Sequence, residues 1–346
     1  MGRSEAPLIL LALALSISSV QSRAATIRVP LDQATIQAGI NAAGEGDTVL
    51  VAPGTYTGAA NRELDFGGTN MVVMSEAGAD QTTIDCESMN VAFAIWRGED
   101  STSVIRGFTI VNGNGGNGGG IVVNNATPTI ENCVFYGNVA FFNGGGIYYS
   151  YTPAQGVIRG CVFYGNTATS RGGGIECDHA SARISGCLFY ENTVTTTTSL
   201  IYYGGGGLHG NSSTVTVTNC TFVRNAASVG SGGVYSYAGN ITVEKSIVAF
   251  STEGPGLSVD HVAQCVVFGN AGGDSLSWDN SGILFVDPLF CDVASDDYTL
   301  CANSPCLPGS STNPWGVLLG ALGQGCDDCE AAVESSSWGR VKGIFK

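Results

Sequence analysis

Apolar and polar side chains alternate with a period of two residues through the middle of the chain. The clearest motif is Cys-x-Phe-x-x-Asn at residues 133–138, in which the cysteine and the phenylalanine share one face. It recurs at residues 161–166, 187–192 and 220–225. A helix would instead place apolar residues three and four positions apart. The pattern therefore predicts short β-strands with one buried face.

A second motif, a glycine run followed by an aliphatic residue, alternates with the first. It occurs at residues 118–121, 144–147, 172–175, 204–208 and 232–234. Successive aliphatic residues are 26, 28, 33 and 26 positions apart, and the long interval contains an insertion at 193–203. A fixed repeat of this length indicates a solenoid. Each repeat would form one turn, and its strands would pair in parallel with the next turn at ~4.8 Å.

Equivalent residues of successive repeats should then form columns along the solenoid. The predicted interior columns are Asn138, Asn166, Asn192 and Asn225; Phe135, Phe163, Phe189 and Phe222; and Cys133, Cys161, Cys187 and Cys220. Stacked asparagine amides can hydrogen-bond along the column. The spacing between turns allows both free thiols and disulfides in the cysteine column, and the sequence leaves this choice open.

The N-terminal residues have the pattern of a secretory signal peptide. Arg3 precedes the apolar run 8–20, and small residues suited to cleavage follow near Ser22–Ala25. A buried N-terminal helix is the alternative interpretation. No later apolar stretch reaches the ~18 residues of a membrane span, so we expect no transmembrane segment in the mature chain. The predicted location is extracellular or at the cell surface.

The chain divides into five predicted segments. Residues 35–43 form a short amphipathic helix with Ile36 and Ile40 on one face, which would cap the open N-terminal end of the solenoid. The segments are a signal peptide (1–24), an N-terminal strand and capping helix (25–46), a parallel β-helix (47–290), a Cys-rich C-terminal cap (291–329), and a linker with a basic amphipathic tail (330–346).

Charge and cysteine content narrow the possible partners. The formal net charge is −15, which disfavours nucleic acid and anionic lipid, and also polyanionic sugars unless basic residues cluster locally. Twelve cysteines in an exported chain indicate an oxidising compartment. Five of them lie at positions 291–329, which predicts disulfides in the C-terminal segment. The pair Cys326 and Cys329 also suits half of a zinc site, but the sequence shows no second pair beside it.

Three segments resemble known families. Residues 35–58, TIQAGINAAGEGDTVLVAPGTYTG, resemble the opening segment of bacterial proteins of the pectin-lyase-like superfamily. The Gly-Gly-x-Ile and Phe-x-x-Asn repeats resemble those of chlamydial polymorphic membrane proteins, and residues 287–323 are similar to the closing segment of secreted bacterial right-handed β-helix proteins. The resemblance implies an all-β fold, a single-stranded right-handed parallel β-helix. That fold serves lyases, hydrolases, esterases, epimerases, adhesins and non-enzymes alike.

The catalytic motifs of those enzyme families are incomplete in this chain. A polygalacturonase-like Gly-His-Gly is Leu-His-Gly at residues 208–210, and the glutamate of a pectinesterase-like Gly-x-Tyr-x-Glu is Gly58. The pectate lyase likeness is confined to Ser-Val-Asp-His at residues 258–261. These departures favour a protein without enzymatic activity, but they leave the question open.

Strand periodicity also predicts an outward-facing patch beside the glycine runs. Its members are Tyr148, Tyr151, Glu176, Asp178, His209, Asn211, Tyr235 and Tyr237. Tyrosines stack on sugar faces, while acids and amides bind hydroxyl groups. Glu176 and Asp178 would lie about 7 Å apart at their Cα atoms, so these two acids with His209 are also candidate catalytic residues. The alternative is an ordinary solvated β face.

A second outward column holds Tyr136, Tyr164 and Tyr190. This column is apolar enough that we expect something to cover it. The cover would be the insertion at 193–203; the alternatives are a stacked ligand or a lateral partner. No metal site or other cofactor is predicted. The three histidines fall on different turns of the solenoid. The run 112–120 lacks the aspartates of a calcium repeat, so calcium is only a weak expectation.

These observations lead to three functional hypotheses. The first is a secreted or cell-surface protein that binds a polysaccharide or a surface partner through an outer β face. The second is a polysaccharide lyase or glycoside hydrolase that uses Glu176 and Asp178. The third is a structural surface protein. A recessed site walled by the insertion would favour the enzyme hypothesis. A flat face of exposed tyrosines would favour the binding hypothesis. The oligomeric state is not predicted.

Overall fold

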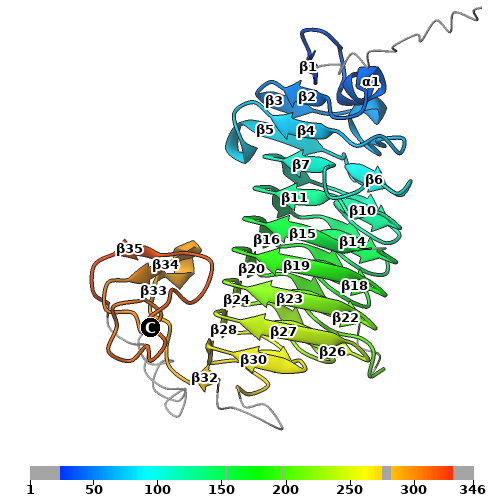
Figure 1. The fold of residues 1–346 in the computed structure, drawn as a ribbon. Helices are drawn as coiled ribbons and strands as arrows, with labels where there is room; N and C mark the ends of the chain where they lie inside the picture. Colours follow the sequence, from blue (N-terminus) through cyan, green and yellow to red (C-terminus); the bar gives the residue numbers. More distant parts are fainter. Residues whose placement is uncertain (1–23, 153, 197, 199, 275–281, 330–346) are drawn as a thin grey trace, which may run out of the picture.

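The computed structural model describes residues 24–152, 154–196, 198, 200–274 and 282–329. They form a parallel β-solenoid of about 11 turns with one α-helix near its N-terminal end (Figure 1). The predicted fold class is confirmed. The predicted signal peptide and the basic tail at 330–346 lie outside the described residues.

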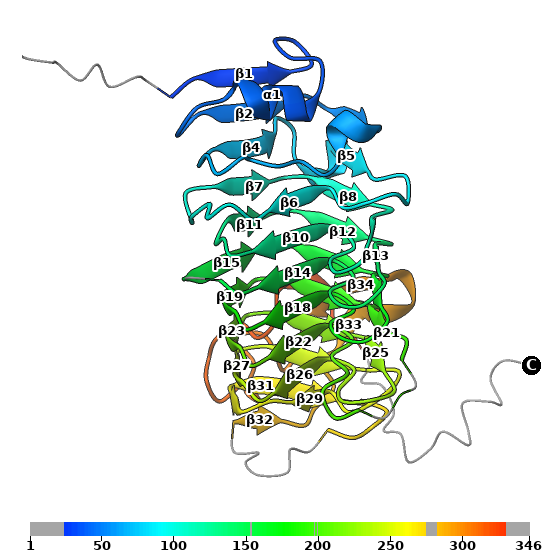
Figure 2. The same ribbon diagram turned by 90° about the vertical axis from the view of Figure 1, so that its right-hand side faces the viewer.

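Each turn contributes strands to up to four parallel sheets, here called A to D, which run along the solenoid (Figure 2). Sheet A contains β1 (Thr26–Val29), β2 (Thr48–Val51), β4 (Val72–Ser75), β7 (Val104–Arg106), β11 (Thr129–Glu131), β15 (Gln155–Arg159), β19 (Ser181–Ser185), β23 (Thr214–Thr218), β27 (Asn240–Glu244) and β30 (His261–Ala263). Sheet B contains β3 (Gly54–Tyr56), β5 (Thr82–Asp85), β8 (Thr109–Val111), β12 (Val134–Tyr136), β16 (Val162–Tyr164), β20 (Leu188–Tyr190), β24 (Thr221–Val223), β28 (Ile247–Ala249), β31 (Cys265–Phe268) and β32 (Ile283–Leu284).

The other two sheets are shorter. Sheet C contains β6 (Phe93–Ile95), β10 (Ile121–Asn124), β14 (Ile147–Ser150), β18 (Ile175–Asp178), β22 (Leu208–Asn211), β26 (Val234–Tyr237) and β29 (Leu257–Ser258). Sheet D contains β9 (Asn114–Gly115), β13 (Val139–Ala140), β17 (Thr167–Ala168), β21 (Thr193–Val194) and β25 (Ala226–Ala227). The 3₁₀ segments are η1 (Ala59–Asn61), η2 (Ala79–Gln81) and η3 (Val293–Ser295).

The glycine runs form the corner between sheets D and C. A β-carbon on Gly145 would lie 2.2 Å from the carbonyl oxygen of Gly173 in the next turn. This contact is shorter than any non-bonded carbon–oxygen distance, so the two turns can approach only because neither residue has a side chain. Gly144, just before, adopts a left-handed backbone with φ of 70°. The glycines therefore set the close stacking that places the outer face of sheet C.

The predicted interior columns are present. Phe163 stacks between Phe135 and Phe189 with ring centroids 4.6 and 4.7 Å apart, and all three are fully buried. Asn166 Nδ2 donates to Asn192 Oδ1 at 2.9 Å, and the bond repeats from turn to turn. The cysteine column contains free, buried thiols, which settles the choice that the sequence left open.

The N-terminal end is covered by α1 (Ile36–Ala42), close to the predicted bounds. Thr35 caps the helix by accepting a hydrogen bond from the backbone N–H of Ala38. Ile36 and Ile40 are buried against the first turns. The helix therefore covers apolar surface that the end of the solenoid would otherwise expose.

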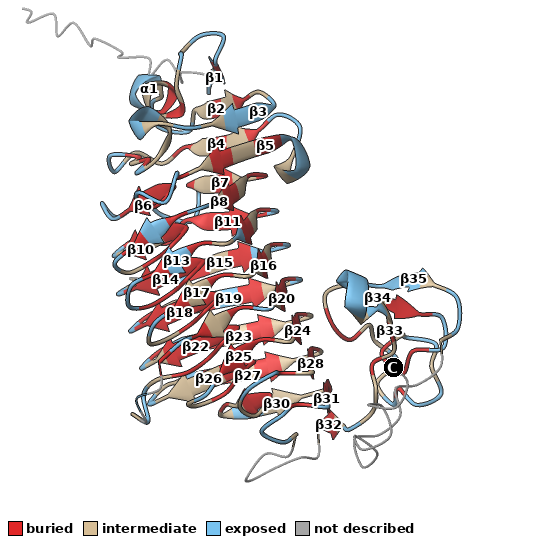
Figure 3. Ribbon diagram, turned by 180° about the vertical axis from the view of Figure 1, so that it is seen from behind, coloured by how far each residue is buried: buried red, intermediate tan, exposed pale blue. Residues whose placement is uncertain are grey.

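The C-terminal segment is a small sheet of β33 (Phe290–Asp292), β34 (Asp297–Cys301) and β35 (Gln324–Cys326). The predicted disulfides are present, as Cys291–Cys326 and Cys301–Cys329. The segment lies beside the later turns of sheet B (Figures 1 and 3), whereas the sequence analysis expected it to close the end of the solenoid. The reason is an apolar outer surface on these turns, which packs against Phe290, Tyr298 and Leu319.

This arrangement also corrects the expected cover of the tyrosine column. The rings of Tyr136, Tyr164 and Tyr190 stack on one another with centroids 4.3 and 4.9 Å apart. Tyr190 is covered by Tyr298 of the C-terminal segment, at 5.1 Å. In the described part of the insertion, Ile201 and Tyr202 instead contact side chains of sheet C. Tyr136, farther along the column, is 47% exposed.

Candidate functional site

The predicted site residues lie on the outer face of four adjacent strands of sheet C. Strands β14, β18, β22 and β26 pair in register, so that Tyr148, Glu176, His209 and Tyr235 form one column. The second column contains Ser150, Asp178, Asn211 and Tyr237. Interior side chains such as Ile175 and Cys177 alternate with them along the strands and point into the core. The structure therefore brings the predicted residues together.

Their exposure differs from the prediction of an open patch. Glu176 and His209 are fully buried, and Tyr148 and Asp178 are less than 10% exposed. Neighbouring loops cover the face: Arg171, which precedes the glycine run of its turn, reaches Glu176. The Tyr235 hydroxyl donates to the carbonyl oxygen of Ile201 in the insertion. The expectation of a bare face is therefore wrong for its centre.

The buried centre is a small cluster of polar side chains. His209 Nδ1 lies 2.8 Å from Glu176 Oε2, and Arg171 Nη1 lies 3.5 Å from Glu176 Oε1. The first contact is close in distance but is not aligned as a hydrogen bond, and His209 Nε2 has no hydrogen-bond partner within the described chain. Buried polar groups without aligned partners are costly, and they concentrate at functional sites. The ring of Tyr235 packs over His209 at 5.3 Å.

Asp178 connects this cluster to the surface. It accepts hydrogen bonds from Asn211 Nδ2 at 2.7 Å and from the Tyr148 hydroxyl at 2.9 Å. Burial alone would raise the pKa of Asp178, but these two donors and the nearby Arg171 guanidinium together lower it. Burial, with the Asp178 charge, raises the pKa of the Tyr148 hydroxyl. At neutral pH Asp178 is therefore an anion held by a neutral phenol.

The lowered pKa makes a prediction about acid stability. The stabilisation by ionised Asp178 is complete above the pKa of an unfolded aspartate, ~3.9, and is lost as pH falls through the lower folded value. Asp178→Asn should therefore destabilise the protein at pH 7, and the difference from the wild type should shrink at pH 3. Urea unfolding at the two pH values measures it. Asp80→Asn, at an exposed site, is the control, and an equal loss at both pH values would contradict the assignment.

Part of the predicted patch remains open to solvent along the ends of the strands. Tyr151 is 55% exposed, and its ring stacks on that of His179 at 5.3 Å. Asn211 and Tyr237 are half-buried, and Tyr237 lies 6.0 Å from the ring of Tyr202 in the insertion. We call Tyr151, His179, Asn211 and Tyr237 the edge strip. From β14 to β26 it spans three strand spacings, about 14 Å.

Comparison with known proteins identifies the family. Residues 49–222, half of the chain, match the family model of the right-handed β-helix region. The chain belongs to this right-handed β-helix family. No curated protein matches the sequence. In the described part of the β-helix, no helix is long and apolar enough to cross a membrane.

Sequence reasoning missed two members of this β-helix site. Arg171 was not a candidate, although an arginine directly before a glycine run is a visible departure from the small and apolar residues around it. His179 was considered only as a metal ligand, yet it flanks Asp178 with Nδ1 at 3.0 Å from Oδ1. The site can therefore offer two aromatic rings and an amide to a ligand lying along the strand ends, while the buried Asp178 positions the amide.

Proposed function

We propose that this right-handed β-helix is an exported protein that binds a polysaccharide along the edge strip of sheet C. The observation that carries the proposal is the placement of exposed Tyr151 and half-buried Tyr237 on either side of Asn211 and ionised Asp178. Aromatic faces pack against sugar rings, and the Asn211 amide, which the buried Asp178 carboxylate orients, can bind hydroxyl groups. A parallel solenoid repeats such positions at a constant spacing, which suits a linear polymer.

Charge narrows the ligand class. The net charge of −15 and the ionised Asp178 repel polyanions, so we infer a neutral or amino-sugar polymer. Export is supported by the signal pattern at 1–24 and by two disulfides, which persist in oxidising compartments. The resemblances to pectin-lyase-like proteins and to polymorphic membrane proteins are consistent with a cell-surface location.

The binding test replaces the two tyrosines of the edge strip. Affinity electrophoresis through gels containing single neutral, amino-sugar or acidic polysaccharides would be run with the wild type and with Tyr151→Ala/Tyr237→Ala. We expect retardation by a neutral or amino-sugar polymer, and about tenfold or greater weakening in the variant, because each aromatic contact is worth roughly 1 kcal/mol.

Tyr136→Ala is the matched control, since Tyr136 is an exposed tyrosine on sheet B. It should bind as the wild type does, and the melting temperatures should show that all three proteins are folded. Failure of the wild type to bind any of the polymers, or equal loss in both variants, would refute the proposal.

A catalytic role is the second candidate, because one observation favours it. Glu176 is recessed beneath a loop wall and lies beside His209 and Arg171, as a glycosidase or lyase acid would. Its complete burial, however, leaves no path for a substrate in this conformation, so binding is the better-supported function. Incubation with the bound polymer and a reducing-end assay separates the two: cleavage that disappears in Glu176→Gln would establish the enzyme.

A further inference from the structure

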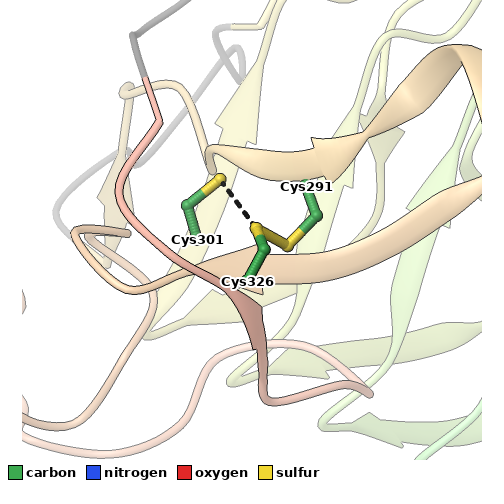
Figure 4. A group of neighbouring side chains, drawn as sticks. All are labelled: Cys291, Cys301 and Cys326. Carbon is green, nitrogen blue, oxygen red and sulfur yellow. Dashed lines mark hydrogen bonds between the residues drawn. A yellow bond between two sulfur atoms is a disulfide. The ribbon is translucent and has the colours of Figure 1, made fainter.

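The C-terminal segment gathers four cysteines that are distant in sequence. Cys291 lies in β33, Cys301 ends β34, Cys326 ends β35 and Cys329 follows three residues later. Figure 4 shows the first three, with the Cys301 sulfur pointing at the Cys291–Cys326 bridge. Cys326 and Cys329 have the spacing of half a zinc site, and the sequence shows no second pair beside them. The fold supplies that pair as Cys291 and Cys301.

The sulfur positions are close to those of a tetrahedral metal centre. A zinc–sulfur bond of ~2.3 Å in a tetrahedron places the sulfurs about 3.8 Å apart. Cys326 Sγ lies 3.6 Å from Cys301 Sγ and 3.8 Å from Cys329 Sγ, and these contacts join cysteines of different disulfides. The sulfurs of Cys291, Cys301 and Cys326 all lie within 4.8 Å of one another. Opening the two disulfide bonds would leave four thiols gathered in one cluster, and the two formerly bonded pairs would have to move apart to complete a tetrahedron.

The surroundings can hold the cluster without the disulfides. Asn303 fixes the loop of Cys329 through two backbone hydrogen bonds: its Nδ2 donates to the Cys329 carbonyl at 2.8 Å, and its Oδ1 accepts from the Cys329 N–H at 3.1 Å. Cys301 is buried, and the neighbouring Asp327 and Asp328 are exposed. Their negative charges attract a cation.

We propose that the reduced form of this cluster binds one zinc-class divalent cation through Cys291, Cys301, Cys326 and Cys329. Each disulfide takes two electrons and two protons from a dithiol, which becomes a disulfide itself, and yields two protein thiols. Metal binding then displaces the four thiol protons to solvent. The same four residues thus cross-link the C-terminal segment through disulfides when oxidised and through a metal ion when reduced. This inference does not depend on the proposed function.

The test uses the whole purified chain. The protein is reduced with dithiothreitol, desalted without oxygen and titrated with Co²⁺, whose thiolate charge-transfer and d–d absorption bands report tetrahedral sulfur ligation. Zn²⁺ should displace cobalt, and metal analysis after gel filtration should give about one zinc per chain. The oxidised protein should retain none, and zinc should raise the melting temperature of the reduced protein only.

Two variants locate the ion. Cys326→Ser/Cys329→Ser should lose the cobalt spectrum and the bound zinc. Cys306→Ala, which removes a buried free thiol of the same segment, should keep both. Absence of zinc on the reduced wild type would overturn the proposal, and so would undiminished zinc on the double variant, because the metal would then lie on other thiols.

Discussion

Replacing Phe163 with alanine should lower the free energy of unfolding by about 4 kcal/mol. The side chain is fully buried, and its ring stacks on both neighbours of the phenylalanine column, Phe135 at 4.6 Å and Phe189 at 4.7 Å. Truncation removes the transfer free energy of the ring and leaves a cavity that the rigid parallel strands can fill only in part. Because each turn contacts only its neighbours, one missing ring weakens two interfaces between turns.

Equilibrium unfolding in urea, followed by circular dichroism, measures this loss. Phe163→Leu should cost less than about 1.5 kcal/mol, because it keeps much of the volume. Phe141→Ala, at a phenylalanine that is 67% exposed, should change stability by less than about 0.5 kcal/mol. A small loss of unfolding free energy in Phe163→Ala would mean that the phenylalanine column contributes little to stability.

The solenoid and its columns could be predicted from sequence because their causes are local. Period-two alternation defines which side chains enter the core, and the repeat interval defines which residues meet in the next turn. Phe163 therefore stacks on Phe189, and Asn166 hydrogen-bonds to Asn192, each one repeat away. The same logic placed Tyr148, Glu176 and His209 on adjacent strands of sheet C.

What covers a face could not be predicted in this way. The burial of Glu176 depends on Arg171 and on the path of the insertion, neither of which follows the repeat. The position of the C-terminal segment, in contrast, could have been predicted from the sequence. The outward positions of the later turns of sheet B include the apolar residues Leu188, Val223 and Ala249, and such a surface requires a partner.

The cluster of four cysteines in the C-terminal segment shows a further limit. Cys291 and Cys301 meet Cys326 and Cys329 only because β34 pairs with both β33 and β35. Sequence spacing alone does not encode that pairing.

Asn192→Ala should lower the free energy of unfolding by about 3 kcal/mol, the second large effect that we expect. The side chain is fully buried in the asparagine column and serves both neighbouring turns. Its Oδ1 accepts from the backbone N–H and the Nδ2 of Asn166, and its Nδ2 donates to the Phe163 carbonyl and to Asn225 Oδ1. Alanine removes the side-chain partner of the buried Asn166 N–H and of the Phe163 carbonyl, each loss costing roughly 1–3 kcal/mol before local relaxation. Asn166 Nδ2 and Asn225 Oδ1 each lose one of two hydrogen bonds.

Asn192→Asp separates hydrogen bonding from volume. Aspartate has nearly the same shape and keeps the acceptor for Asn166, but it replaces the amide donor with an oxygen that faces the Phe163 carbonyl and Asn225 Oδ1. It should therefore destabilise the fold at least as much as alanine, because one oxygen of a buried carboxylate then faces two other oxygen atoms with no donor between them. Asn240→Ala, at an exposed position on β27, should be nearly neutral. If Asn192→Asp were tolerated, the column would be held by packing, and the amide ladder would not be the element that joins one turn to the next.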